Sequence, residues 1–268
     1  MKRSSLLLAF ACAIAGAVAS AEEPPRKHVH ALVAAMGNDF QVIYEEKSTG
    51  SSIPPFRRRT FQTEPNQLNR LVLRSLDKAM EKSDPGSERL YLALNPPAGV
   101  DPIEWIVGEL RKIDQHAQWD SIIVATPGYQ GLAQNRMPPK MQGMGLFAQP
   151  LCQSNPVDCD RREVPMNGAD AVTPDGKPIQ ANYFIAPFSL LDIRILDPKT
   201  LAVIETLASY DHQKVWDPTA VSSNLFENVS NRAMAEHIVV LVERSVTSAM
   251  EESGLRGKVE VKMLKEVK

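Results

Sequence analysis

Short buried-strand patterns alternate with amphipathic helices through the first half of the chain, and this alternation limits the possible fold more than any other feature. Apolar runs at 29–36, 90–94 and 121–125 are typical of buried strands. Between them, apolar residues recur at helical spacing over 66–82 and again after the capping sequence Asp101-Pro-Ile-Glu104. Such an order favours a sheet covered by helices, so we predict an α/β fold of mixed, partly α+β character.

The second half of the chain adds a hairpin and a final helix. Apolar and polar residues alternate over 191–195, and Asp197-Pro-Lys-Thr200 has turn chemistry before a return strand. Helical spacing returns over 231–252. We therefore predict one domain, with a mixed sheet, about three packed helices and a late β-hairpin within 183–208.

Four other segments have weaker patterns. Residues 29–44 contain two extended runs around Gly-Asn-Asp, which favours a second hairpin. Residues 47–65 are rich in Pro, Gly and Ser and are expected to form a loop. Residues 126–182 have little periodicity and are expected to be a long irregular segment of functional importance. Residues 259–263 alternate as an edge strand would.

The N-terminus has the pattern of a secretory signal peptide. Lys2 and Arg3 precede an apolar run over 6–18, and Ala19-Ser20-Ala21 is a small-residue cleavage site. We predict cleavage after residue 21 and export to the periplasm. The alternative is an uncleaved N-terminal anchor, which the short apolar run and the cleavage site disfavour.

The expected mature domain, residues 22–268, is mildly acidic. Loss of Lys2 and Arg3 leaves 28 basic and 32 acidic residues. This balance argues against a protein that binds nucleic acid through its overall charge. No apolar run after the signal approaches the roughly 18 residues of a spanning helix, so we expect no transmembrane span after cleavage.

Two cysteines remain in the expected mature domain, Cys152 and Cys159. An even pair in an exported protein favours a disulfide bond. The competing interpretation is a pair of thiolate metal ligands, but a second pair, typical of structural zinc sites, is absent from the sequence.

Three segments carry a resemblance to a known group of proteins. They are Asp120–Pro127, the segment Gly143-Met-Gly-Leu-Phe147, and the hairpin Leu191–Ile204. Together they resemble a family of uncharacterised exported envelope proteins of Gram-negative bacteria. The hairpin is also distantly similar to the curli-secretion and TolB N-terminal type of domain, with Leu201 where that type has glycine after Thr200. The resemblance implies an α/β binding or assembly module and no catalytic residue.

The candidate binding residues are three consecutive arginines, Arg57, Arg58 and Arg59, between two phenylalanines. Guanidinium groups recognise phosphate and carboxylate. In the cell envelope the partner would be an anionic envelope component or an envelope protein. The alternative is a solvated loop without a partner.

Two histidine motifs could carry metal or acid–base chemistry. His28 and His30 would share one face of a strand and could bind a metal or pair with a carboxylate. Asp211 and His212 are adjacent and could act as an acid–base pair. Exposed positions at a chain end and at a strand end are the competing interpretations.

Three methionines, Met137, Met141 and Met144, could supply thioether ligands to copper, or could simply fill core gaps under a loop. The sequence contains no Gly-x-Ser-x-Gly, Walker or dinucleotide-binding motif, so we predict no catalytic residue and no cofactor.

These observations favour an exported periplasmic binding or assembly protein of the cell envelope with no evident catalytic machinery. Two alternatives stay open. One is a periplasmic hydrolase that uses an Asp/His site, and the other is a periplasmic copper or zinc carrier.

Overall fold

The computed structural model describes residues 26–45, 56–131, 140–150, 183–213, 215–216 and 230–255. Within this part of the chain, nine strands form one mixed sheet and two more form a small separate ribbon. The main-sheet strands are β1 (Val29–Ala34), β2 (Asp39–Glu45), β3 (Phe56–Gln62), β4 (Glu88–Ala93), β5 (Ser121–Pro127), β8 (Met144–Pro150), β9 (Tyr183–Leu196), β10 (Val203–His212) and β11 (Val215–Trp216). The ribbon pairs β6 (Tyr129–Gly131) with β7 (Lys140–Gln142). The helices are α1 (Gln67–Ser83), α2 (Pro102–Leu110), α5 (Asn231–Glu252) and the short 3₁₀ helix η1 (His116–Gln118).

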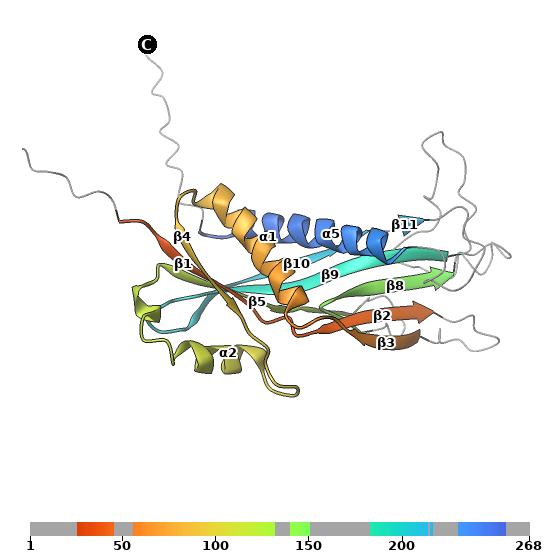
Figure 1. The fold of residues 1–268 in the computed structure, drawn as a ribbon, viewed down its shortest axis with the longest axis horizontal. Helices are drawn as coiled ribbons and strands as arrows, with labels where there is room; N and C mark the ends of the chain where they lie inside the picture. Colours follow the sequence, from red (N-terminus) through yellow and green to blue (C-terminus); the bar gives the residue numbers. More distant parts are fainter. Residues whose placement is uncertain are drawn as a thin grey trace, which may run out of the picture.

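The long strand β9 organises the sheet. One edge of β9 pairs first with β8 and then with β5, whereas the other edge pairs with β11 and β10. Two halves of the sheet therefore join the same hydrogen-bonding edge of β9, at different positions along its length. One half is β8-β2-β3 and the other is β5-β1-β4. Figure 1 shows the two halves extending in different directions from β9.

Helices cover both faces of the sheet, which confirms the predicted α/β fold in one domain. Helices α1 and α5 lie on one face, and α2 lies on the other (Figure 1). Strand β1 is buried on both sides, as a central parallel strand should be. Its Leu32 and Ala34 pack toward α1 and α5, and Ala31 and Val33 pack toward α2.

The predicted hairpin over 29–44 is wrong. Strand β1 pairs in parallel with β4 and β5, and strand β2 pairs with β3 and β8. The turn residues between them redirect the chain without reversing it. Gly37 has a φ of 68°, a left-handed conformation that glycine adopts without strain. As a result the chain passes from one half of the sheet into the other at this point.

Two segments expected to lack regular structure contain strands. The segment 47–65 includes β3, and the segment 126–182 includes β6, β7 and β8. Strand β8 escapes sequence recognition because it contains Gly145, a residue disfavoured in strands. The glycine is required there, since a Cβ at this position would collide with the Gln41 carbonyl oxygen and would lie 2.6 Å from the Phe188 ring.

The hairpin of β9 and β10 is confirmed. The Asp197 carboxylate accepts hydrogen bonds from the amides of Lys199 and Thr200, both at 2.8 Å. Leu201 has a φ of 59°, so leucine adopts the left-handed conformation that glycine would supply in this turn. The leucine side chain is buried with the α2 core, and this burial offsets the backbone strain.

The predicted signal peptide, both mature cysteines, Met137 and the predicted strand at 259–263 lie outside the described residues. Among the helices that are described, none has the length and apolar character needed to cross a membrane.

Candidate functional site

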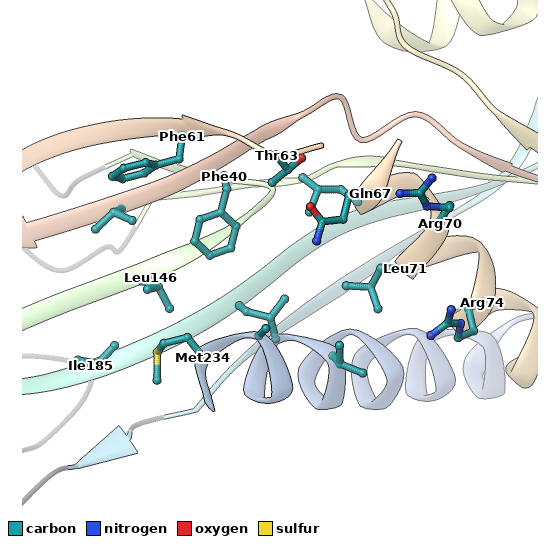
Figure 2. A pocket seen from close by; sticks show the side chains of 15 residues that line it. Phe40, Phe61, Thr63, Gln67, Arg70, Leu71, Arg74, Leu146, Ile185 and Met234 are labelled. Atoms are coloured by element: carbon teal, nitrogen blue, oxygen red, sulfur yellow. The ribbon is translucent and has the colours of Figure 1, made fainter. Parts of the chain in front are cut away.

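A groove of about 610 Å³ lies between the β2–β3–β8 half of the sheet and helices α1 and α5. A volume of this size falls in the range of roughly 300–1,000 Å³ that is usual for small-molecule sites. Figure 2 shows side chains from the sheet and from both helices around the same space.

The groove wall is mostly apolar, and six elements contribute apolar side chains to it: β2, β3, β8, β9, α1 and α5. Those apolar side chains are Phe40, Val42, Phe61, Leu68, Leu71, Leu146, Ile185, Met234, Ala235, Ile238 and Val239. Strands β2 and β3 present them in register, because Phe40 lies directly opposite Phe61 in the antiparallel pair. Helix α5 contributes Met234 and Ile238, which are one turn apart and so lie on one side of the helix.

One end of the groove is polar and positively charged. Helix α1 places Arg70 and Arg74 one turn apart, and Thr63 and Gln67 lie beside them. Figure 2 places both guanidinium groups at the α1 end, away from Ile185 and Met234. Both arginines are exposed, and neither forms an ion pair with a carboxylate within the described part of the chain. The groove is therefore amphipathic along its length.

The sequence forms this arrangement through the two sides of α1. Leu68, Val72 and Leu76 occupy the core side of the helix, while Arg70 and Arg74 occupy the solvent side next to the groove. The buried Asn69 fixes the helix to the end of β1, since its Oδ1 accepts a hydrogen bond from the Met36 amide at 2.7 Å. The start of β2, and with it Phe40, is positioned by the same contact.

The three candidate arginines lie on the edge strand β3 instead of a loop. Arg59 is opposite Val42, a groove residue, and Arg57 is opposite Tyr44 on the same side. Arg58 is opposite Ile43 and faces the other side of the sheet. The structure therefore separates the three residues, with two on the groove side.

The structure brings His28 and His30 together with Asp84, a residue that sequence reasoning missed. The carboxylate oxygen Oδ2 of Asp84 lies 2.8 Å from His28 Nδ1 and 2.9 Å from His30 Nε2. The second ring nitrogen of His30, Nδ1, lies 2.8 Å from the Ser121 hydroxyl. The cluster forms where β1 begins, α1 ends and β5 begins.

Burial and charge differ sharply among the members of this cluster. The His30 side chain is 7 % exposed, that of Asp84 is 29 % exposed and that of His28 is 63 % exposed. The hydrogen bond to Asp84 raises the pKa of His28. The hydrogen bonds from His30 and then His28 lower the pKa of Asp84.

Asp211 and His212 do not form the acid–base side-chain pair that was one interpretation of their sequence. Neighbouring residues on β10 point to opposite faces, and the Asp211 carboxylate accepts two hydrogen bonds from Arg244 at 2.6 and 2.8 Å. The His212 backbone amide, not its ring, contacts Asp211.

The methionines within the described residues are core residues. Met141 and Met144 are both buried, and Met144 packs in the cluster under α1 and α5. Their thioethers fill the interior, which matches the packing interpretation of these residues.

Comparison with family models and with curated proteins finds no match to this chain. Solved structures that align with it include a neuraminyllactose-binding hemagglutinin homologue from Helicobacter pylori, with 8 % identity, a TM-score of 0.32, and coverage of 85 % of this chain and 82 % of that one. A PelC dodecamer from Paraburkholderia phytofirmans aligns at 7 % identity and a TM-score of 0.29, covering 85 % and 91 %. The hypothetical protein CT253 from Chlamydia trachomatis aligns at 10 % identity and a TM-score of 0.26, covering 84 % and 98 %.

Proposed function

We propose that this protein is an exported binding protein of the cell envelope whose groove takes a single-chain amphiphile with an anionic head group. The signal pattern of residues 1–21 supports export. The observation that carries the proposal is the amphipathic groove, with an apolar wall and two arginines at one end.

The apolar wall favours an acyl chain. Val42, Leu146 and Ile238 are nearly inaccessible to bulk solvent, yet they line the groove. An alkyl chain against such a wall gains about 0.8 kcal/mol for each buried methylene. Since the groove walls offer few polar partners apart from Thr63 and Gln67, a chain without hydrogen-bonding groups fits them best.

The two arginines favour an anionic head. A guanidinium binds carboxylate or phosphate through paired N–H donors, and Arg70 and Arg74 stand close enough on one helix side to act on the same group. They form a local exception in a chain of net negative charge. Arg57 and Arg59, on the groove side of β3, add to the positive charge on that side.

Competitive displacement of a fluorescent fatty acid tests the proposal. Palmitate and hexadecanol share one chain but differ in head charge. For the wild type we expect palmitate to bind about tenfold more tightly, since a charge-assisted hydrogen bond contributes about 1.5–3 kcal/mol and part of that is lost to solvent. In the Arg70→Gln/Arg74→Gln variant the two ligands should bind equally.

A matched pair of substitutions on α5 tests the site itself. Ala235 is exposed and lines the groove, so Ala235→Trp should block both ligands. Val240 is 53 % exposed and lies outside the groove on another side of the same helix, so Val240→Trp should leave both affinities unchanged. Equal binding by both tryptophan variants, or no binding of palmitate to the wild type, would contradict the proposal. Lysophosphatidylglycerol as a third ligand distinguishes a phosphate head from a carboxylate.

A further inference from the structure

We propose that His28, His30 and Asp84 form a binding site for one zinc ion. Three potential ligand atoms from these residues lie within 4.8 Å of one another. The site is independent of the groove, because it lies at the C-terminal end of α1 and the groove arginines lie nearer the other end.

The convergence of the ligand atoms is the first argument. Both histidine nitrogens approach the same carboxylate oxygen, so the three atoms surround one point. In a tetrahedral site with bonds of about 2.0–2.1 Å, ligand atoms are separated by about 3.3 Å. The two nitrogen–oxygen separations of 2.8 and 2.9 Å would widen by about half an ångström to admit the ion. The two nitrogens, which lie within 4.8 Å of each other, would settle to the same tetrahedral spacing.

The chemistry of the donor set is the second argument. Two imidazoles and one carboxylate are a set that zinc uses, with the remaining position open to water. The exposed side of His28 leaves room for that position. Hard cations such as Ca²⁺ and Mg²⁺ prefer all-oxygen sets, so a pair of histidines disfavours them.

The surroundings of His30 are the third argument. A metal-bound histidine usually donates its other ring N–H to a nearby acceptor, which fixes the ring and its tautomer. The Ser121 hydroxyl is in position to accept from His30 Nδ1, and both residues are buried. In the metal-free chain Nε2 donates to the Asp84 carboxylate, 2.9 Å away. With zinc bound, Nδ1 would carry the ring proton and Nε2 would be the ligand atom. His30 is therefore held in place before any ion arrives.

Nearby charges also suit a cation. Asp120 lies beside the cluster, where its Oδ2 accepts a hydrogen bond from the Val29 amide at 2.7 Å. Arg26 is 3.8 Å from that same oxygen and offsets part of the Asp120 charge, but its side chain is 70 % exposed, so the pair is screened by solvent.

Isothermal titration of untagged, metal-free protein with zinc chloride tests the site. The wild type should bind one zinc per chain. His28→Ala removes an exposed side chain and should not affect folding, and Asp84→Asn keeps the shape of the carboxylate. Each should weaken zinc binding at least tenfold, whereas His212→Ala, an exposed histidine elsewhere, should bind as the wild type does. Ser121→Ala should weaken binding about ten- to hundredfold through loss of the support to His30.

The cysteines require their own control. Repeating the titration in a Cys152→Ser/Cys159→Ser background should give the same stoichiometry. Loss of zinc binding in that background would assign the ion to the thiolates and overturn the proposal. So would unchanged affinity in both His28→Ala and Asp84→Asn. Cobalt substitution gives a second readout, since a tetrahedral site with nitrogen and oxygen ligands produces visible absorption that His28→Ala should abolish. Palmitate binding that fails while zinc binding persists would count against the groove alone.

Discussion

Replacement of Asn69 by leucine should destabilise the protein far more than a typical helix substitution. The Asn69 side chain is completely buried in α1. Its Oδ1 accepts from the Met36 amide at 2.7 Å, and its Nδ2 donates to the Leu94 carbonyl at 3.0 Å. Leucine has nearly the same shape but can satisfy neither backbone group.

The magnitude follows from these two partners. A buried polar group left without a hydrogen bond costs about 1–3 kcal/mol. Asn69→Leu leaves two such groups unsatisfied, while the buried leucine carbon returns part of the cost. The expected decrease in the free energy of unfolding is therefore about 2–4 kcal/mol. Ser75→Ala is the matched control on the same helix. Ser75 is also buried, but within the described residues its hydroxyl bonds only to the Leu71 carbonyl of its own helix, so the loss should stay below about 1 kcal/mol.

Urea unfolding followed by far-ultraviolet circular dichroism measures both variants. The transition midpoint should fall in Asn69→Leu with little change in slope. The reasoning would be refuted if the free energy of unfolding of Asn69→Leu stayed within about 1 kcal/mol of the wild-type value, or if Asn69→Leu and Ser75→Ala lost equal amounts. Palmitate binding should also weaken in Asn69→Leu, because Met36 precedes the strand that carries Phe40 into the groove.

Three further predictions rest on other elements. Gly145→Ala should lower the free energy of unfolding by about 3 kcal/mol, measured by chemical unfolding, because the added Cβ overpacks against Gln41 and Phe188. Gly108→Ala in α2 is the control: a Cβ there meets no atom within 4 Å, so this variant should be neutral or slightly stabilising. Asp197→Asn tests the pH dependence of the hairpin turn. Backbone hydrogen bonds, foremost that from Thr200, lower the pKa of Asp197, so its ionised form stabilises the fold above the ordinary carboxyl pKa. The stability difference between wild type and Asp197→Asn should therefore be full near neutral pH and vanish as the pH falls through the lowered pKa; a difference that grows in acid would contradict this. Replacing Arg57, Arg58 and Arg59 together with serine should reduce partitioning onto anionic vesicles about a hundredfold at low salt, since each basic residue near an anionic surface contributes roughly 1 kcal/mol of attraction. As the control, the Arg111→Ser/Lys112→Ser variant should co-sediment with the vesicles as the wild type does.

The elements predicted from the sequence are those whose pattern is local. Helix α1 has a continuous apolar side and α2 has a capping Asp101 whose carboxylate accepts from two amides, so both are recognisable without their neighbours. The hairpin of β9 and β10 has its turn encoded within a few residues around Asp197.

The elements that escaped prediction depend on distant partners. Strand β3 contains three charged residues in a row and is ordered by its pairing with β2. The Gly37–Asp39 turn is compatible with reversal or with redirection, and the choice is made by the strands that flank β1 and β2. Local pattern alone carries no information on that choice.

The candidate sites were predictable only in part. The pairing of His28 with His30 follows from strand periodicity, but their partner Asp84 is 54 residues beyond His30, at the end of α1. Its one local signal is the helix-ending sequence Asp84-Pro-Gly. The groove could not be predicted, because its wall combines β2, β8 and α5, which lie far apart in the chain at 39–45, 144–150 and 231–252.

Helix α1 connects the two proposed sites, and its packing predicts that they act independently. Arg74 and Asp84 are ten residues apart, which is about 15 Å along a helix axis. Between them Leu76 and Met80 are fully packed in the core, so the helix behaves as a rigid element with a single arrangement. Free-energy changes at two sites this far apart, without shared contacts, usually add to within about 0.3–0.5 kcal/mol. Palmitate affinity measured with and without saturating zinc should therefore agree within about twofold, and zinc affinity should be equally insensitive to palmitate, since linkage is reciprocal. A larger mutual change would mean that α1 shifts as a body when one site is filled, and Asn69→Leu, which loosens its attachment to β1, should then reduce that coupling.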